Sequence, residues 1–155
     1  FLKNEKIKEN ICCGLSKSEI DEKTYLSSVE SANLKELIDE LPNGVDTMVG
    51  ERGIKISGGQ QQRVAIARAL YIDRKIIVLD EATSSLDGIS ENNILKRLSL
   101  FAGSYKKTII MVTHNINLTR SSDVIHLIDK GSLVESGNFN SLLTNDIFKK
   151  LLNEQ

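Results

Sequence analysis

The sequence predicts an α/β protein in which a mostly parallel sheet is flanked by helices. Two short segments, residues 76–79 and Thr108–Val112, are almost entirely apolar, which is typical of parallel strands that helices cover on both faces. Segments with helical periodicity precede the first of these strands, separate the two and follow the second. Strands that alternate with helices in this order favour a parallel sheet.

The composition is that of one folded domain or part of one. The 155 residues are 40% hydrophobic, which is enough for one sizeable core. The 20 basic and 21 acidic residues leave a net charge of -1, so there is no overall positive field to hold nucleic acid or an anionic membrane. No apolar run approaches the roughly 20 residues that cross a bilayer. The adjacent Cys12 and Cys13 suit neither a mutual disulfide nor a metal site, and indicate a reducing, cytoplasmic setting.

Helices are predicted before the first strand. Periodic apolar positions between residues 16 and 40 predict two short helices, the second capped by Asn33 and ended by the sequence PNG at residues 42–44. A glycine-punctuated loop, TMVGERG at residues 47–53, leads toward a third helix. Ser57 is the expected N-cap of that helix, which we predict over Gly58–Tyr71.

The start of this third helix has the chemistry of an anion-binding site. Ser57, Gly58, Gly59 and Gln60 combine a hydroxyl, free backbone N–H groups and the positive end of a helix dipole. The two glycines let a phosphate approach closely, because they carry no side chain. The simpler alternative is an ordinary N-cap that follows a flexible loop.

The first apolar strand ends in two acids, Asp80 and Glu81. Ligands bind at the carboxyl ends of parallel strands, and a carboxylate there is suited to Mg²⁺ on a nucleotide. The second carboxylate is then free to orient or deprotonate an attacking water. In the alternative interpretation the two acids only begin a loop and cap the following turn.

The rest of the chain completes the α/β pattern. A helix is expected over residues 90–100, with Ile94, Leu95, Leu98 and Leu100 turned inward. The second strand ends in Thr113 and His114. Residues 124–128 and 133–135 flank the turn sequence DKGS at 129–132 and predict a hairpin. Residues 140–155 are predicted to form one final helix.

Taken together, these motifs resemble the nucleotide-binding domains of ATP-binding cassette (ABC) proteins. ISGGQ at residues 56–60 resembles the signature motif, IIVLD at 76–80 the Walker B strand, and SSLD at 84–87 the D-loop. Glu81 resembles the catalytic glutamate and His114 the switch histidine. The resemblance implies a P-loop NTPase-like core with an inserted helical subdomain at about residues 14–70, and the C-terminal half of the catalytic core at about 71–155.

The resemblance also implies roles for individual residues and the cofactors ATP and Mg²⁺. Asp80 is expected to hold Mg²⁺ through water, Glu81 to polarise the hydrolytic water, and His114 to contact the γ-phosphate. Ser57, Gly58, Gly59 and Gln60 are expected to face ATP held by a second nucleotide-binding domain in a head-to-tail dimer. Asp87 is expected to couple the two sites. The other implied partner is a transmembrane domain, and no nucleic acid is expected.

The phosphate loop GxxxxGK[ST] does not occur in these 155 residues. In the family it lies upstream, and the opening FLKNEKIKENICCG resembles the segment just after the following Gln loop. We therefore expect the chain to be a C-terminal fragment that is inactive alone. We also expect it to be poorly stable, oligomeric or domain-swapped, because the missing strand would leave unpaired edges and uncovered apolar surface.

TMVGERG resembles the loop before the signature motif in export-type transporters, with Met48 where Glu is usual. This implies a transporter or lipid flippase with its ATPase domain at the cytoplasmic face of a membrane. A composition rich in Lys, Ile and Asn suggests a bacterial source. Two alternatives remain open: a soluble ABC ATPase of DNA repair or translation, and a non-catalytic module that pairs with a complete domain.

Overall fold

The computed structural model describes residues 2–154 apart from Lys17, Arg52 and Asp87, and apart from the side chain of Ile89. Two compact units meet in the sequence between Met111 and Val112, and each is described here by itself. The division expected from the resemblance, near residue 70, concerns family subdomains and stays a prediction. Among the described residues no helix is both long enough and apolar enough to cross a membrane.

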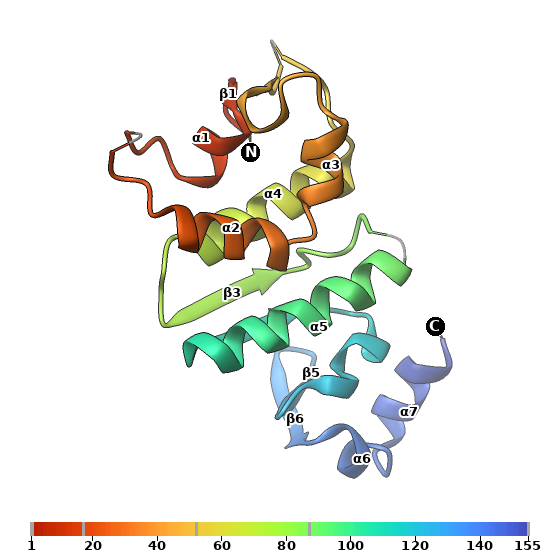
Figure 1. Ribbon diagram of the computed structural model, residues 1–155. Helices are drawn as coiled ribbons and strands as arrows, with labels where there is room; N and C mark the ends of the chain where they lie inside the picture. The colour runs from red at the N-terminus through yellow and green to blue at the C-terminus, as the bar shows by residue number, and fades with distance from the viewer. Residues whose placement is uncertain (1, 17, 52, 87, 155) are drawn as a thin grey trace. The chain divides into compact units, whose positions relative to one another are not determined.

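The first unit holds most of the secondary structure (Figure 1). Its elements in chain order are β1 (Glu5–Lys6), α1 (Ile7–Ile11), α2 (Glu22–Ser31), α3 (Lys35–Glu40), the 3-10 turn η1 (Gly44–Asp46), β2 (Met48–Val49), α4 (Gly58–Tyr71), β3 (Ile76–Asp80), α5 (Gly88–Tyr105) and β4 (Thr108–Val112).

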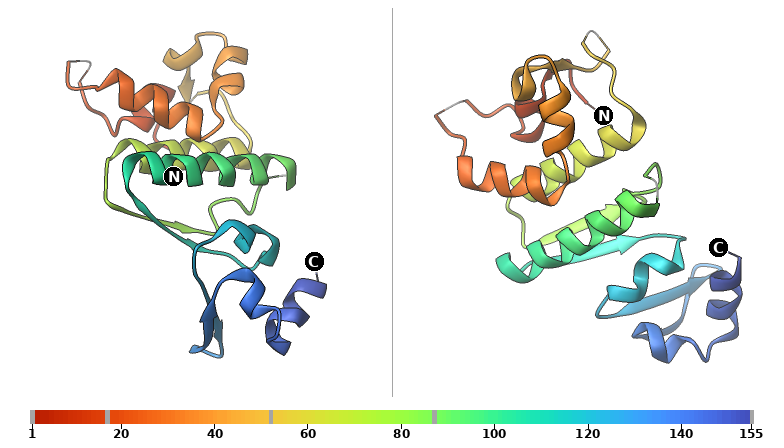
Figure 2. Two further views of the ribbon diagram at one scale, coloured as in Figure 1. Left: turned by 60° about the horizontal axis from the view of Figure 1, so that its bottom comes forward. Right: turned by 45° about the vertical axis from the view of Figure 1, so that its right-hand side comes forward.

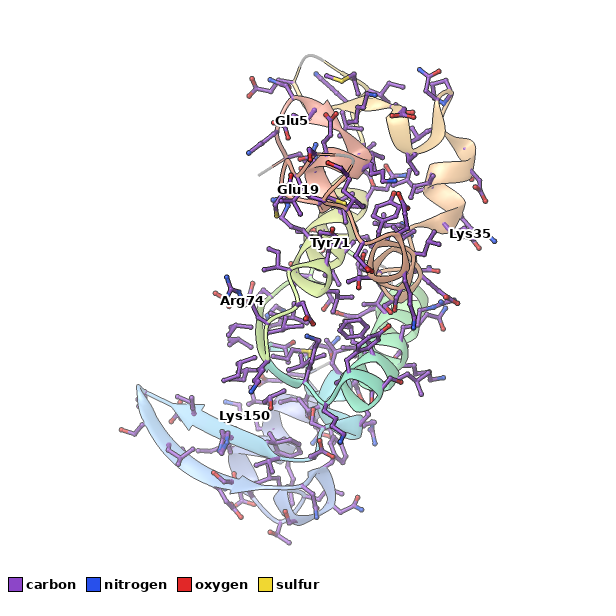
Figure 3. All side chains as sticks on the ribbon, turned by 60° about the vertical axis from the view of Figure 1, so that its left-hand side comes forward. Glu5, Glu19, Lys35, Tyr71, Arg74 and Lys150 are labelled. Atoms are coloured by element: carbon purple, nitrogen blue, oxygen red, sulfur yellow. The ribbon has the colours of Figure 1, made fainter. Side chains whose placement is uncertain are left out.

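Helix α4 is the centre of the first unit. It packs against α1, α2 and β3, and α2 also contacts α5. Its inward face is fully buried at Val64, Ile66, Ala67 and Leu70. At its C-terminal end the hydroxyl of Tyr71 accepts the backbone N–H of Asp21 at 3.3 Å, which joins α4 to the loop before α2 (Figure 3). The predicted bounds of this helix and its Ser57 cap are confirmed.

The strands are arranged in three small sheets rather than one. β3 pairs with β4, β1 with β2, and β5 with β6. The N–H of Thr108 donates to the carbonyl of Lys75, so β3 and β4 start at the same end and run parallel, joined by α5 as a crossover helix (Figure 2). The other two pairs are antiparallel. The α/β class is confirmed, whereas the prediction of a mostly parallel sheet holds only for β3 and β4.

The prediction that the first apolar strand is buried on both faces is wrong for this chain. Ile77 and Leu79 are buried against the helices, but Ile76 and Val78 are each 60% exposed. Successive side chains of a strand point to opposite faces, and the helices of the unit cover one face only. β4 follows the same alternation, with Ile110 exposed.

The sequence predicted that Asn33 caps α3, but the structure shows that it does not. It lies in the left-handed backbone region, with φ of 52°, after the end of α2. The N–H of Asn33 donates to Glu30 and the N–H of Leu34 donates to Val29, which is the Schellman arrangement that ends a helix. Leu34 occupies the N-cap position of α3 and makes no side-chain cap. Asn33 therefore closes the first helix of this pair rather than opening the second.

Helix α5 is longer than predicted at both ends, and one inward residue was assigned wrongly. Ile94 and Leu98 are buried as expected, but Leu100 is 71% exposed and Phe101 is buried instead. Positions i, i+4 and i+7 share one helical face, which selects residues 94, 98 and 101. Leu100, six positions after Ile94, lies on another face of the helix.

The N-terminal segment contains a helix that the sequence did not predict. α1 lies beside β1, and the buried side chain of Asn10 joins the two. Its Nδ2 donates to the carbonyls of Lys3, Glu5 and Lys6, and its Oδ1 accepts the N–H of Lys3 at 2.9 Å. The guanidinium of Arg68 on α4 donates to both the carbonyl and the Oδ1 of Asn10.

The second unit contains the 3-10 turn η2 (Ile116–Ser121), the predicted hairpin and two short helices. β5 (Ile125–Asp129) and β6 (Ser132–Gly137) are joined by Lys130 and Gly131, whose φ values are 48° and 76°. Positive φ at both positions is the requirement of a type I′ turn. The hairpin prediction is confirmed.

The single helix predicted over residues 140–155 is instead two, α6 (Phe139–Leu142) and α7 (Asp146–Asn153). Asn145 breaks it, because its Oδ1 accepts the N–H groups of Ile147 and Phe148 and so starts a new helix. Phe148 is fully buried and meets Phe139 edge-on, with 5.5 Å between ring centroids.

Candidate functional site

The first turn of α4 is capped by its own side chains, and its start is exposed to solvent. The Ser57 hydroxyl accepts the N–H of Gln60 at 3.2 Å, and the Gln60 side-chain oxygen accepts the N–H of Ser57 at 2.8 Å. In this reciprocal cap the Ser57 hydroxyl proton and the Gln60 amide N–H₂ are still able to donate. Ser57 and Gly58 are exposed. The arrangement therefore presents donors and a helix dipole to an incoming anion.

The two glycines of this turn lie against a second segment, residues 84–86. A Cβ atom added to Gly59 would meet the carbonyl oxygen of Ser85 at 2.9 Å and a methyl group of Leu86 at 3.0 Å. A Cβ on Gly58 would meet the Ser85 side chain at an ordinary 3.8 Å. Gly59 is therefore required by the close approach of the two segments, whereas Gly58 tolerates a small side chain.

The acids at the end of β3 begin this second segment. Asp80 is the last residue of the strand, and its side chain is exposed. Glu81 follows with φ of 45°, in the left-handed region that disfavours residues with a Cβ. Its carbonyl accepts the N–H of Ser84 at 3.1 Å, and the carbonyl of Thr83 accepts the N–H of Leu86 at 3.0 Å. Residues 81–86 therefore form a pair of overlapping turns, which we call the acidic turn.

Gln62 joins the acidic turn to α4 directly. Its side-chain Nε2 donates to the Ser84 hydroxyl at 3.2 Å, and its Oε1 accepts the N–H of Ser85 at 3.1 Å. The sequence did not single out Gln62, because it is one of three consecutive glutamines of which only Gln60 belongs to the resembling motif. Residues two positions apart lie on different sides of a helix, so the spacing between Gln60 and Gln62 could have indicated that Gln62 faces a different neighbour.

The structure thus brings Ser57, Gly58, Gly59 and Gln60 into one unit with Asp80 and Glu81. Two of the predicted site residues are not placed with them. His114 lies two residues beyond β4, is exposed and belongs to the second unit, so its expected contact with the γ-phosphate stays a prediction. Asp87 lies outside the described residues.

The donors at this site fit a nucleotide-bound magnesium ion rather than a metal cage made of protein ligands. Within the described part of the chain, no group of three or more His, Cys, Asp and Glu side chains is placed to hold a metal ion. Mg²⁺ on a nucleotide needs only one or two carboxylates, because phosphates and water supply the other ligands. An exposed Asp80 beside Glu81 is compatible with that mode.

A model of the ABC transporter family matches residues 1–84, which is more than half of the chain. The matched part runs through α4, β3 and most of the acidic turn.

Relatives from fungi, bacteria and plants match across nearly the whole chain. The chain is 43% identical over 139 residues to the ABC multidrug transporter mdr1 of Aspergillus fumigatus, covering 90% of this chain and 10% of that protein. It is 43% identical over 143 residues to the ATP-dependent lipid A-core flippase of Pseudoalteromonas translucida, covering 92% of this chain and 24% of the relative. It is 42% identical over 137 residues to ABC transporter B family member 21 of Arabidopsis thaliana, and this match covers 88% of this chain and 10% of that protein. The expected bacterial source is therefore not confirmed.

A solved structure has the same fold over the described chain. It is the structure of a bacterial Atm1-family ABC exporter with ATP bound, which superposes with a TM-score of 0.85 at 35% sequence identity. The match covers 99% of this chain and 27% of that one. The chain thus corresponds to about a quarter or less of the length of the proteins it matches.

Proposed function

The chain belongs to the ABC transporter family, and on that premise we propose that it is part of an ATP-hydrolysing domain of an export-type transporter or flippase. The observation that carries the proposal is the direct contact between two motifs within the first unit. The anion-binding start of α4 and the acidic turn touch through Gly59 and Gln62. One motif offers hydrogen-bond donors for an anion and the other offers carboxylates, and these are the groups that chemistry on a phosphate requires.

In the proposed mechanism each side chain has one task. Asp80 would hold Mg²⁺, and that ion would supply neutralisation of the charge on the phosphates. Glu81 orients the attacking water and accepts its proton, while His114 contacts the γ-phosphate. The strained backbone at Glu81 is typical of a functional residue that the surrounding structure holds in place.

The start of α4 serves a second nucleotide in this proposal. Ser57, Gly58, Gly59 and Gln60 donate to the γ-phosphate of ATP held by a second nucleotide-binding domain, in a head-to-tail pair. Asp87 couples the two sites across that interface. The phosphate loop that holds ATP from the other side is supplied by a segment outside these 155 residues. The fragment alone is expected to be inactive for that reason.

The export-type assignment rests on the relatives and on one loop. The named relatives are multidrug transporters and a lipid A-core flippase, and the solved relative is an exporter. The TMVGERG loop begins as β2, which pairs with β1, and folds back where the N–H of Ile54 donates to the carbonyl of Met48. Met48 and Ile54 are both exposed, which suits a contact with a transmembrane domain at the cytoplasmic face of a membrane. A soluble ATPase of DNA repair or translation has no such support.

The Glu81→Gln substitution tests the proposed activity in the full-length protein. Replacing the carboxylate with an amide removes the proton acceptor but keeps the size of the side chain. We expect kcat for ATP to fall by roughly 100-fold or more, while ATP binding persists. Glu40→Gln, at an exposed position on the last residue of α3, is the matched control and leaves kcat unchanged. Hydrolysis that survives Glu81→Gln at the wild-type rate would refute the role.

A further inference from the structure

We propose that Gln62 is a positioning residue that fixes the acidic turn against the first turn of α4, and so sets the place of Glu81. The inference rests on the proposed ATPase function for its catalytic consequence. It rests on geometry alone for the tether itself. Gln62 lies on α4 next to the anion-binding turn, and its partners lie 22 and 23 residues later in the sequence.

Both ends of the Gln62 side-chain amide are used. The Nε2 donates to a hydroxyl and the Oε1 accepts a backbone N–H, at 3.2 and 3.1 Å. A planar amide that bonds at both ends is fixed in rotation as well as in position. Both bonds are exposed to solvent, so the tether depends on the two bonds acting together on one side chain rather than on burial.

A second observation shows that the two segments are held at close range. Any side chain at Gly59 would overlap the Ser85 carbonyl or the Leu86 side chain. The glycine allows the approach, and the glutamine bonds across it from the next turn of the same helix. Together they fix both the distance and the lateral register between α4 and the acidic turn.

Glu81 depends on this register through the backbone. Its carbonyl accepts the N–H of Ser84, the residue whose hydroxyl Gln62 holds. A residue with positive φ keeps that conformation only where its surroundings enforce it. Without the tether the turn is free to move relative to the helix, and a displacement of about 1 Å at a catalytic group can lower the rate by 10²-fold.

The test compares Gln62→Met with Gln61→Met in the full-length protein. Methionine is close in size to glutamine but makes neither bond. Gln61 is the matched control, because its amide donates to the carbonyl of Ile56, and no bond from it to the acidic turn is found among the described residues. Two quantities are measured: hydrogen exchange of the peptide containing the Ser85 amide, and the steady-state kcat and KM for ATP.

We expect Gln62→Met to speed exchange at Ser85 by about tenfold or more, and to lower kcat by roughly 10- to 100-fold with KM nearly unchanged. Gln61→Met leaves both at wild-type values. Gln62→Glu is the rescue variant, since one carboxylate oxygen still accepts the hydrogen bond of the Ser85 N–H and the other accepts a hydrogen bond from the Ser84 hydroxyl. It retains slow exchange and most of kcat.

The outcomes separate the tether from the proposed function. Unchanged exchange at Ser85 in Gln62→Met overturns the tether, and faster exchange with unchanged kcat overturns its positioning role. A wild-type protein that binds no ATP overturns the proposed function and with it the catalytic consequence, while the exchange data still decide whether the tether exists. Loss of kcat in Gln62→Glu equal to that in Gln62→Met also contradicts the proposal.

Discussion

Glu81 combines a strained backbone with a proposed catalytic carboxylate. Its φ of 45° is one that residues with a Cβ adopt at a cost of roughly 1–2 kcal/mol. Positive φ also occurs at the helix end at Asn33 and the hairpin turn at Lys130, so what distinguishes Glu81 is the combination of this strain with a carboxylate proposed to act in catalysis. Stability and activity should therefore respond in opposite directions to substitution here.

Glu81→Gly is predicted to stabilise the protein while abolishing ATP hydrolysis. Glycine relieves the left-handed strain, and its greater entropy in the unfolded chain offsets part of the gain, which leaves a net stabilisation of about 0.5–1 kcal/mol. The denaturant midpoint measures the effect, with Glu81→Gln as the control that removes the charge but keeps the strain. A midpoint for Glu81→Gly below that of Glu81→Gln would contradict the explanation.

The two adjacent cysteines are predicted to react very differently. Cys12 is fully buried and Cys13 is exposed. Burial raises the pKa of the Cys12 thiol from 9.0 to about 11, partly opposed by a hydrogen bond with Tyr71. A maleimide added to the native chain at pH 8 should label Cys13 quickly and Cys12 only in denaturant. Rapid labelling of both thiols in the native chain would contradict the structure.

The same shift predicts a loss of stability at high pH. The folded state holds the Cys12 proton more tightly than the unfolded state does, so the contribution is present below pH 9 and is lost as pH rises toward about 11. Cys12→Ser removes this component of the pH dependence. Urea midpoints measured across that range, for wild type and variant, decide the matter. The same dependence of the urea midpoint on pH in the two proteins would contradict a contribution from Cys12.

Among the elements, the contact of β1 and α1 with α4 depends on Asn10. It makes three donations to backbone carbonyls and accepts from Lys3 and Arg68 while 2% exposed. Asn10→Ala should lower the free energy of unfolding by about 2–4 kcal/mol, because several buried polar groups lose their partner at once. Equilibrium denaturation measures this. Asn92→Ala, at an exposed position whose amide donates to the carbonyl of Gly88 within α5, is the control and should cost well under half as much.

The second unit depends in the same way on one cap. Asn145 starts α7 and also donates to the Glu135 carboxylate on β6 at 2.7 Å. Asn145→Ala should destabilise the second unit by about 1–2 kcal/mol. Hydrogen exchange over residues 112–155 should speed up while exchange in α4 is unaffected. Asn140→Ala, an exposed position in α6, is the control, and an equal effect there would refute the cap's importance.

The elements that the sequence predicted well are those whose ends are coded locally. Ser57 and Gln60 mark the start of α4 within four residues, and a two-residue turn marks the hairpin. The failures involve side chains that serve a different neighbour from the expected one. Asn33 ends α2 rather than starting α3, and Asn145 divides what periodicity alone presents as one helix.

For the whole molecule, burial was harder to predict than secondary structure. Ile76 and Val78 have the sequence of a buried strand yet lie exposed, because burial depends on which other segments cover a face. The candidate site shows the same limit. Its residue types follow from short motifs, whereas the link through Gln62 joins segments more than 20 residues apart and is visible only in the fold.

In the proposed function the site is half of a composite, and the start of α4 is expected to face a nucleotide held by a partner. Gly58 allows this to be tested cleanly, because a Cβ there meets nothing closer than 3.8 Å. Gly58→Asp places a negative charge at the anion site, whereas Gly58→Ala adds a methyl group without charge. Both changes are compatible with the packing.

The most direct measurement is phosphate release from Mg-ATP by a complete ATP-binding domain of this family, with and without the 155-residue chain. The account predicts no release by the chain alone, a higher rate when the two are mixed, no gain with Gly58→Asp and a gain with Gly58→Ala. Phosphate release by the chain alone, or an undiminished gain with Gly58→Asp, would contradict the central claim that these residues complete a nucleotide site on a partner.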